Sequence, residues 1–332
     1  MNLVTGATGH IGNVLVRLLL EHGEAVRAMI MPGEDPTPLN GLEVEIVEAD
    51  VLDYSSLRKA FKNIEVVYHL AGIISILPGK QPLVQAVNVL GTRNVLQAAH
   101  DTGVRRLIYT SSIHALQRVP HGILIDETIP FDPEHSISSY DSSKATASLE
   151  VLNAVQHGLD AVIVCPTGVI GPYDFRRSEM GQLILDCVER KPMLYVDGAY
   201  DFVDVRDVAE GLLLASQKGR CGESYILSGE RIEVLNIIKI VQEILGERIF
   251  SLKIPFKLAN LTANITPLYY RLTHGKPRFT PYSLATIVSN SVISHAKAHL
   301  ELGYYPRPLR DSLSDTVKWF LKYKSFSKNT QS

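Results

Sequence analysis

The sequence is poor in the residues on which disulfide-rich and zinc-binding proteins depend. Its 332 residues include three cysteines, Cys165, Cys187 and Cys221, which lie far apart and form no Cys-x-x-Cys pair. Neither a disulfide framework nor a zinc site is therefore predicted, and we expect no bound metal. A reducing compartment, the cytoplasm, is the expected location.

An excess of charge and long apolar runs are also missing. The chain has 33 Lys and Arg against 35 Asp and Glu, so a nucleic-acid partner has no electrostatic support. The most apolar late stretch, 251–270, is interrupted by lysines, asparagines and prolines. It lacks the ~20 uninterrupted apolar residues of a membrane-spanning helix. We expect a lid or substrate-pocket segment there, with a helix on a membrane surface as the alternative.

What the sequence does contain is an alternation of strand and helix patterns, which is typical of parallel βαβ units. Hydrophobic residues make up 45% of the chain, enough for a sizeable core. The patterns predict an α/β fold with a doubly wound parallel sheet and ligands at the carboxyl ends of its strands. The predicted strands are 2–5, 25–31, 44–49, 66–71, 106–112 and 161–165. The predicted helices are 12–21, 54–61, 83–101, 140–156, 180–189, 205–216, 234–245 and 309–322.

A glycine-rich turn, TGATGHIG, follows the first predicted strand directly. Glycines at these positions permit a tight turn and let backbone N–H groups approach a pyrophosphate at the start of the next helix. Because a βαβ pattern follows, the turn indicates a Rossmann-type dinucleotide site rather than a purely structural turn. The residues of this turn expected to contact the cofactor are Gly6, Thr8, Gly9, His10, Ile11 and Gly12.

The end of the second predicted strand normally decides between NAD and NADP, through an acid for the ribose or an arginine for the phosphate. Met31 stands there and is neither. Glu34 and Asp35 follow in a loop and are interpreted as solvated charges. The cofactor is therefore NAD or NADP. Asp50, after the third strand, is a candidate acceptor for the adenine amino group, and a capping or turn role is the alternative.

The organisation of the chain changes after Cys165, where proline and glycine punctuation replaces the alternation. We expect residues 1–171, with 200–229 returning to it, to form an NAD(P)-binding domain. Residues 172–199 and 230–322 would form a smaller substrate-binding part. The polar residues 323–332 are expected to be a flexible tail.

Tyr140 and Lys144 stand four residues apart at the start of a predicted helix, so both occupy one helix face. A tyrosine with an ordinary pKa of about 10 exchanges protons poorly at neutral pH, and a neighbouring ammonium lowers that pKa. Ser112 closes the fifth predicted strand at the same sheet edge, where its hydroxyl can polarise a substrate carbonyl. Taken singly, the pair can be an exposed helix face and the serine a cap. Together they indicate a catalytic set.

These motifs resemble the extended short-chain dehydrogenase/reductase family, the NAD-dependent epimerase/dehydratase superfamily, and within it the dihydroflavonol-reductase-like and 3β-hydroxysteroid-dehydrogenase-like members. The resemblance spans nearly the whole chain. Its carriers are TGATGHIG, VVYHLAG, NVLGTRN, YTSSIHA, YDSSK, CPTGVIGP and DFVDVRDVAEG.

The resemblance implies that Ser112 polarises the carbonyl, that Tyr140 is the general acid/base, and that Lys144 orients the nicotinamide ribose and tunes Tyr140. Asn88 is expected to orient a helix near the site, with a simple cap as the alternative. A homodimer through helices 83–101 and 140–156 is expected on resemblance alone. The further cofactor contacts that it implies are Asp50, Val51, Leu70, Ala71, Gly72, Asn88, Pro166 and Val169.

The substrate is narrowed by Tyr200, which replaces an arginine that clamps the diphosphate in sugar-nucleotide enzymes of this family. Ile74, His114 and Tyr173 are the expected substrate-pocket residues, although His114 also fits a structural loop histidine. The set favours a small, fairly hydrophobic ketone or secondary alcohol. A nucleotide-sugar epimerase or dehydratase is the alternative, and a non-catalytic dinucleotide sensor is the second alternative.

Overall fold

A seven-stranded parallel sheet forms the centre of the molecule. The computed structural model describes residues 1–74, 81–263 and 280–329. The strand order is β10-β6-β5-β4-β1-β2-β3, so successive strands run outward from β1 in both directions and leave a topological switch point beside it. The strands are β1 (Asn2–Thr5), β2 (Val26–Ile30), β3 (Glu45–Glu48), β4 (Val66–His69), β5 (Arg106–Thr110), β6 (Ala161–Pro166) and β10 (Ser224–Leu227). The Rossmann-type α/β fold predicted from the sequence is confirmed.

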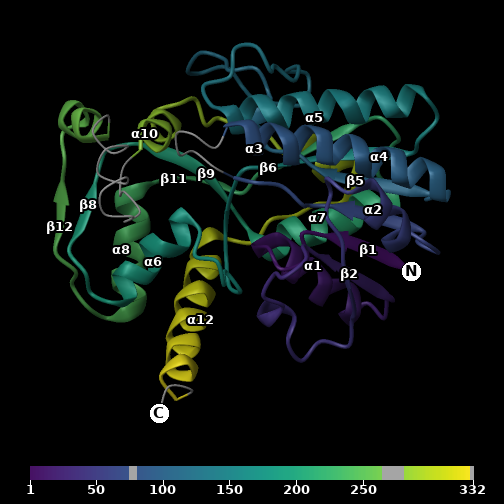
Figure 1. Ribbon diagram of the computed structural model, residues 1–332. Helices are drawn as coiled ribbons and strands as arrows, with labels where there is room; N and C mark the ends of the chain where they lie inside the picture. The colour runs from purple at the N-terminus through teal and green to yellow at the C-terminus, as the bar shows by residue number, and fades with distance from the viewer. Residues whose placement is uncertain (75–80, 264–279, 330–332) are drawn as a thin grey trace.

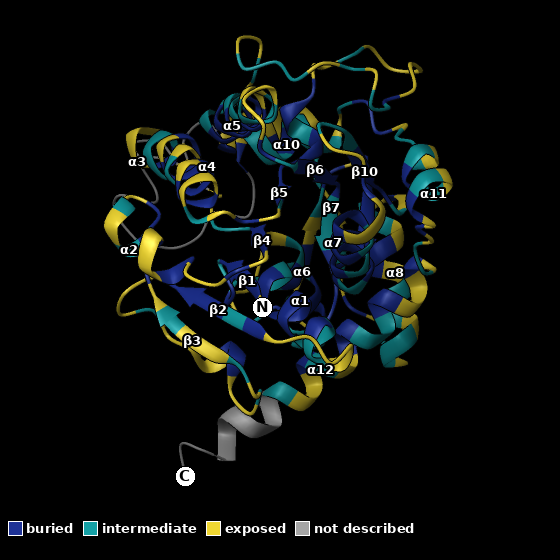
Figure 2. Ribbon diagram, turned by 90° about the vertical axis from the view of Figure 1, so that its right-hand side faces the viewer, coloured by how far each residue is buried: buried dark blue, intermediate teal, exposed yellow. Residues whose placement is uncertain are grey.

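Helices cover both faces of this sheet (Figure 1). On one face α1 packs against α7, and on the other α2 packs against α4 and α4 against α5. Figure 2 shows the strands between these two layers, mostly buried except for β3 at the edge of the sheet, which is mostly exposed. The helices are α1 (His10–Glu21), α2 (Tyr54–Ala60), α4 (Gly91–Thr102), α5 (Ser139–Gln156) and α7 (Val205–Lys218).

Local sequence explains where these helices begin and end. The side chain of Asp53 accepts a hydrogen bond from the backbone N–H of Ser55, so it is the N-cap of α2. The hydroxyl of Ser138 accepts from the backbone N–H of Asp141 and starts α5 immediately before the catalytic candidates. Gly23, with φ +74°, follows the last turn of α1.

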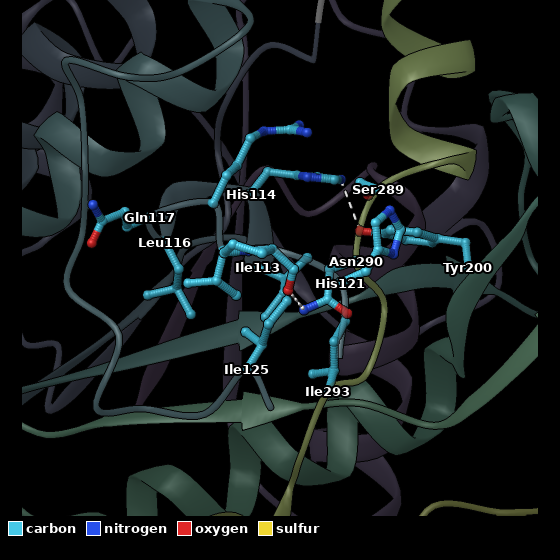
Figure 3. Close-up of a pocket in the computed structure, with 13 residues that line it drawn as sticks. Ile113, His114, Leu116, Gln117, His121, Ile125, Tyr200, Ser289, Asn290 and Ile293 are labelled. Carbon is cyan, nitrogen blue, oxygen red and sulfur yellow. Dashed lines mark hydrogen bonds between the residues drawn. The ribbon is translucent and has the colours of Figure 1, made fainter. Parts of the chain in front are cut away.

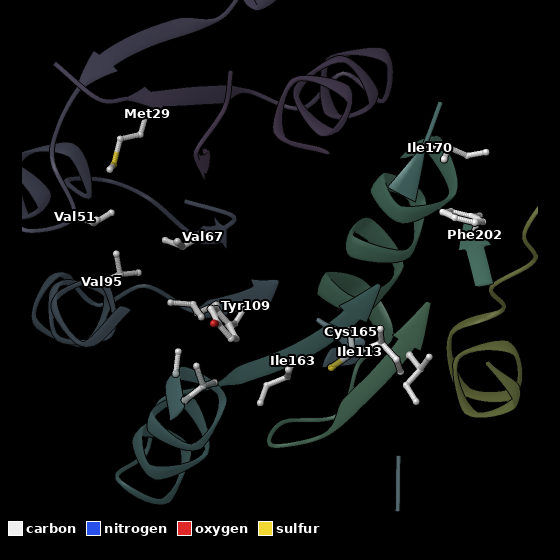
Figure 4. Close-up of a cluster of buried hydrophobic side chains, with 14 of the residues drawn as sticks. Met29, Val51, Val67, Val95, Tyr109, Ile113, Ile163, Cys165, Ile170 and Phe202 are labelled. Carbon is white, nitrogen blue, oxygen red and sulfur yellow. The ribbon is translucent and has the colours of Figure 1, made fainter. Parts of the chain in front are cut away.

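The second part of the chain adds two small sheets beside the large one. One has the order β11-β9-β7, and the other pairs β12 with β8. A hydrophobic cluster runs without a break from Met29 and Val67 in the large sheet to Ile170 and Phe202 in the small one (Figure 4). The strands are β7 (Gly168–Ile170), β8 (Met193–Tyr195), β9 (Ala199–Asp204), β11 (Glu230–Glu233) and β12 (Ser251–Lys253). The helices are α6 (Glu179–Val188), α8 (Val234–Leu245), α10 (Pro281–Ile287), α11 (Ala296–Leu302) and α12 (Leu309–Asn329).

Some elements differ from the prediction. The single helix expected over 83–101 is α3 (Gln81–Gln85), a π-helical turn (Ala86–Leu90) and α4. Helix α12 continues to Asn329, so most of the segment expected to be a tail is helical. Helix α11 packs against α7 and β10 on the large sheet, although the sequence placed it in the substrate-binding part. Within the described residues no helix combines the length and apolarity needed to cross a membrane. Residues 264–270 of the late apolar stretch lie outside the described residues.

Candidate active site

The glycine-rich turn joins β1 to α1 and depends on the absence of side chains. Gly6 has φ +65°, and a Cβ atom on it would lie 2.9 Å from the backbone of Ala71. A Cβ on Gly12 would lie 2.2 Å from the carbonyl oxygen of Gly6. Gly9 is the N-cap of α1, and because it has no side chain, the first N–H groups of the helix have no side-chain acceptor there. The result is a backbone cradle at a helix N-terminus, which fits the pyrophosphate of a dinucleotide.

The other residues expected in this turn have identified partners. Thr8 is 1% exposed, and the Nε2 atom of His10 lies 3.0 Å from the carbonyl oxygen of Pro172. The neighbouring Ile11 packs at the edge of the core cluster between α1 and α7. The segment after β7 therefore contacts the turn through Pro172.

The loop after β4 lies against both the glycine turn and Lys144. The Thr5 hydroxyl accepts hydrogen bonds from the backbone N–H groups of Leu70 and Ala71 at 3.1 and 3.0 Å. A Cβ on Gly72 would lie 3.2 Å from Asn88 Oδ1 and 3.8 Å from the Nζ atom of Lys144. Glycine at position 72 therefore allows the loop to pass close to the lysine.

Asp50 and Val51 follow β3 and have local roles in the structure. Asp50 Oδ1 accepts from the backbone N–H of Leu52 at 2.9 Å, which is the turn interaction considered as the alternative. Val51 is buried beneath Gly91 at the start of α4. An adenine contact by Asp50 stays a prediction. Pro166 ends β6 and Val169 lies in β7, so both lie at the carboxyl end of β6 where the nicotinamide is expected.

Ser112 and Tyr140 form the centre of the site. Ser112 accepts a hydrogen bond from the backbone N–H of His114 at 3.2 Å, and its hydroxyl lies close enough to the phenol of Tyr140 to affect the pKa of that group. The serine is thus both a helix cap and a close neighbour of the tyrosine. Both side chains are buried, 6% and 8% exposed. Burial raises the pKa of Tyr140 to about 12, opposed by the hydroxyl of Ser112.

This direction differs from the expectation that the pKa of Tyr140 is lowered. Desolvation of the phenolate outweighs the favourable effect of nearby donors, so Tyr140 is protonated at neutral pH and is suited to donate a proton. Lys144 is buried as well, and burial lowers its pKa to about 8. Its ammonium donates to the carbonyl of Thr110 at 2.6 Å and to the hydroxyl of Tyr109 at 3.3 Å.

Asn88 connects the loop after β4 to the helix that carries Tyr140 and Lys144. Its amide oxygen accepts from the backbone N–H of Ile73 at 2.8 Å, while its amide nitrogen donates to the Ile73 carbonyl and the Ser143 hydroxyl. Ser143 in turn donates to the carbonyl of Tyr140 at 2.8 Å. Asn88 lies in the π-helical turn, a local widening often found at functional sites. Its amide contacts support the helix-orienting role over the simple cap.

His69 lies behind the site in a buried hydrogen-bond chain that the sequence did not reveal. The Thr92 hydroxyl donates to the carbonyl of Asn88 at 2.7 Å and so accepts from His69 Nε2–H at 3.0 Å. The other ring nitrogen then accepts from the Thr5 hydroxyl at 2.9 Å. Burial lowers the pKa of His69 to about 3, with a smaller effect of the Lys144 charge in the same direction. A neutral imidazole therefore links the glycine turn to the base of α4.

A pocket of about 210 Å³ lies beside the segment that follows Ser112 in the chain (Figure 3). Ile113 and His114, directly after Ser112, line the pocket. Ser289, Asn290 and Ile293, from a segment far along the chain, line it as well. His114 Nε2 lies 2.9 Å from the hydroxyl of Tyr200, and the two rings stack with an interplanar angle of 12°. Burial lowers the pKa of His114 to about 4, so it is neutral at physiological pH.

The three residues expected to face the substrate are separated by the structure. His114 lines the pocket. Ile74 is 78% exposed and is not among the lining residues. The guanidinium of Arg17 lies 4.5 Å from the centroid of the Tyr173 ring, and Trp319 packs near the same ring. None of these three residues lines the pocket. The positive φ of 68° at Tyr173 turns the chain toward α1 there, a turn that the sequence pattern did not signal.

Glu34, interpreted from the sequence as a solvated loop charge, meets Arg176 at the glycine turn. Arg176 donates to the Thr8 hydroxyl at 2.8 Å and forms an ion pair with Glu34. The sequence indicated this pair only through Glu34, an acid that follows β2 a few residues later than the usual position. The distance of 142 residues between the partners hid the pair.

The sequence and the fold of this chain match those of known proteins. A model of the NAD dependent epimerase/dehydratase family matches residues 2–228. The chain is 38% identical to sterol demethylase protein B of Methylococcus capsulatus, over 96% of this chain and 97% of that protein. It is 30% identical to 3β-hydroxysteroid-dehydrogenase/decarboxylase isoform 1 of Arabidopsis thaliana, over 97% and 80%. The crystal structure of gox2253 matches with a TM-score of 0.85 at 35% identity, covering 97% of this chain and 98% of that one.

The chain therefore belongs to the NAD-dependent epimerase/dehydratase family. It is an oxidoreductase of the extended short-chain dehydrogenase/reductase type, as the sequence resemblance predicted. The glycine cradle, the loop at Gly72 and the buried Lys144 are the features of this chain that fit a nicotinamide dinucleotide.

Proposed function

We propose that the protein is an NAD(P)-dependent dehydrogenase or reductase acting on a ketone or secondary alcohol of a fairly hydrophobic small molecule. The observation that carries this proposal is the placement of Ser112 and Tyr140, both buried and close enough for the serine to influence the pKa of the phenol, beside the pocket lined by Ile113 and His114. The relatives named for sterol demethylation and 3β-hydroxysteroid dehydrogenation support a substrate of this kind.

Each catalytic side chain has a separate task. In the reductive direction Ser112 donates a hydrogen bond to the substrate carbonyl, and Tyr140 transfers its phenolic proton to the oxygen as the carbon–oxygen double bond is reduced. A nicotinamide dinucleotide held by the glycine cradle would supply the hydride for this reduction, or accept it in the reverse oxidation. Lys144 holds a positive charge beside the site and compensates the phenolate that Tyr140 leaves behind.

The pocket favours this substrate class over a sugar nucleotide. At the position of the expected diphosphate clamp, Tyr200 is 5% exposed and its hydroxyl is engaged with His114. Arg118 lines the pocket, which is an observation that favours the epimerase alternative. Its guanidinium, however, lies 3.5 Å from the fully buried carboxylate of Asp141. That carboxylate offsets the positive charge that a diphosphate would require.

The test is to follow the absorbance of the reduced dinucleotide while the protein is offered hydrophobic ketones and, separately, sugar nucleotides. Net oxidation of the dinucleotide with the ketones is the expected result. Conversion of a sugar nucleotide without net change in the dinucleotide would contradict the proposal and establish an epimerase. Dinucleotide binding without turnover of any substrate, and without effect of the Tyr140→Phe change, would indicate a sensor.

A further inference from the structure

The end of β2 carries an acid in an unusual place. Met31, at the usual discriminating position, is 59% exposed and has no side-chain group for a ribose hydroxyl. The next residues, Pro32 and Gly33, build a tight turn in which the N–H of Glu34 donates to the carbonyl of Met31 at 3.0 Å. Gly33 has φ +75°, which a turn of this type requires at its third position. The turn therefore folds Glu34 back onto the strand end.

The carboxylate of Glu34 is held at that strand end. Its Oε2 atom accepts from the backbone N–H of Met31 at 3.0 Å, and the side chain is 18% exposed. The neighbouring Asp35 bonds instead to the backbone N–H and hydroxyl of Thr37, at 3.0 and 2.6 Å. Of these two adjacent acids, Glu34 is thus the one fixed at the end of β2.

Glu34 also lies beside the glycine turn. One nitrogen of Arg176 contacts both Glu34 Oε1 and the Thr8 hydroxyl, and Thr8 belongs to the pyrophosphate cradle. A dinucleotide whose pyrophosphate sits at the start of α1 places its adenosine ribose between that turn and the end of β2. The carboxylate of Glu34 lies at this place, although it comes three residues later than the usual acid.

We propose that Glu34 selects the cofactor. Its carboxylate accepts hydrogen bonds from the adenosine ribose hydroxyls, and its charge repels a 2′-phosphate, so that the protein prefers NAD to NADP. This inference rests on the dinucleotide site of the proposed function. The side chain of Arg176 is 58% exposed, so its guanidinium can move away from Glu34 and Thr8 when the ribose binds. Glu34 stays, because the Met31 N–H anchors it.

The competing arrangement uses the same pair in the opposite sense. If Glu34 turned away, Arg176 would be free to bind a 2′-phosphate and the protein would prefer NADP. The two arrangements predict opposite cofactor preferences and different sensitive residues. Binding measurements therefore decide between them without a substrate.

The experiment is a fluorescence titration with NADH and NADPH of the wild type and of the Glu34→Gln, Glu34→Asp, Asp35→Asn and Arg176→Met variants. The wild type is expected to bind NADH at least about tenfold tighter than NADPH, and Glu34→Gln to reduce that ratio by about tenfold. Glu34→Asp, which keeps the charge on a shorter side chain, should weaken NADH while still rejecting NADPH. Asp35→Asn removes the same charge one residue away and should leave the ratio unchanged.

Other results overturn the assignment. A wild type that prefers NADPH and loses this preference on Arg176→Met would assign selection to the arginine. If Glu34→Gln and Asp35→Asn changed the ratio of NADH to NADPH affinity equally, the preference would arise from the net charge of the loop and not from a specific contact of Glu34. Failure of both dinucleotides to bind would overturn the proposed function as well, whereas selective NADH binding without ketone reduction would leave the role of Glu34 standing and reject the function alone.

Discussion

The ammonium of Lys144 donates a 2.6 Å hydrogen bond to the backbone carbonyl of Thr110, which fastens the lysine to the carboxyl end of β5. The ring of Tyr109 lies below the same ammonium, 4.7 Å from its centroid, and the Tyr109 hydroxyl accepts a longer bond. These groups hold a cation that burial has brought close to deprotonation, since the pKa of Lys144 is lowered to about 8.

We predict that ketone reduction depends on pH through Lys144. A lysine whose pKa is lowered to about 8 keeps its charge below that pH and loses it above, so kcat/KM should be level near pH 7 and fall as the pH rises past about 8. Tyr140, with a pKa raised to about 12, stays protonated over this range. Initial rates from about pH 6 to about pH 10 measure the profile.

The matched variant for that profile is Tyr109→Phe, which removes a hydroxyl that accepts from the ammonium. Its decline should begin at lower pH than that of the wild type, because the charged lysine has lost a partner. A wild-type profile that stays level to about pH 10 would show that the charge of Lys144 does not limit the reaction.

Asn88 is expected to contribute to stability through the contacts that orient α5. Asn88→Ala leaves the N–H and carbonyl of Ile73 and the hydroxyl of Ser143 without their partner, at a cost of about 2 to 4 kcal/mol. Ser143→Ala removes fewer hydrogen bonds and should cost about 1 kcal/mol. Urea denaturation measures both. Equal losses in the two variants would show that the bridge from Asn88 to Ile73 contributes nothing.

The fold was largely predictable because its signals are local. Thr5, Gly6 and Gly12 mark a strand and a turn within a few residues, and the periodicity of α8 (Val234–Leu245) predicted its bounds correctly. Strand β10 was missed, because its short sequence pairs with β6 only after a long excursion of the chain. The π-helical turn at Asn88 was also missed, since its helical pattern continues into α4 without interruption.

The site was predictable to the extent that its residues carry local signals. Ser112 follows the end of β5, Tyr140 and Lys144 stand four residues apart at the start of α5, and the structure brings them to the same edge of the sheet. Tyr173 also follows a strand, but its backbone turns away and its ring packs beside Arg17. The pKa of Tyr140 could not be inferred from spacing, because burial and not the neighbouring lysine dominates it.

His69 should make the protein sensitive to acid. Burial lowers its pKa to about 3, from an ordinary value near 6.5. Between these pH values the histidine is therefore protonated in the unfolded chain and neutral in the folded protein. The free energy of unfolding should therefore fall as the pH drops from about 6.5 toward 3. Urea titrations at several pH values should show a shallower dependence for His69→Asn, and an unchanged slope would contradict the role given to His69.

The most direct test of the catalytic set is to compare wild type, Tyr140→Phe and Tyr304→Phe in NADH binding and in the rate of ketone reduction. Tyr304 is the matched control, a buried tyrosine whose hydroxyl bonds the backbone of Ser228. Tyr140→Phe should bind NADH as the wild type does but lose about 10²- to 10⁴-fold in rate, whereas Tyr304→Phe should retain its rate. A Tyr140→Phe variant that reduces ketones at the wild-type rate would contradict the assignment of Tyr140 as the proton donor.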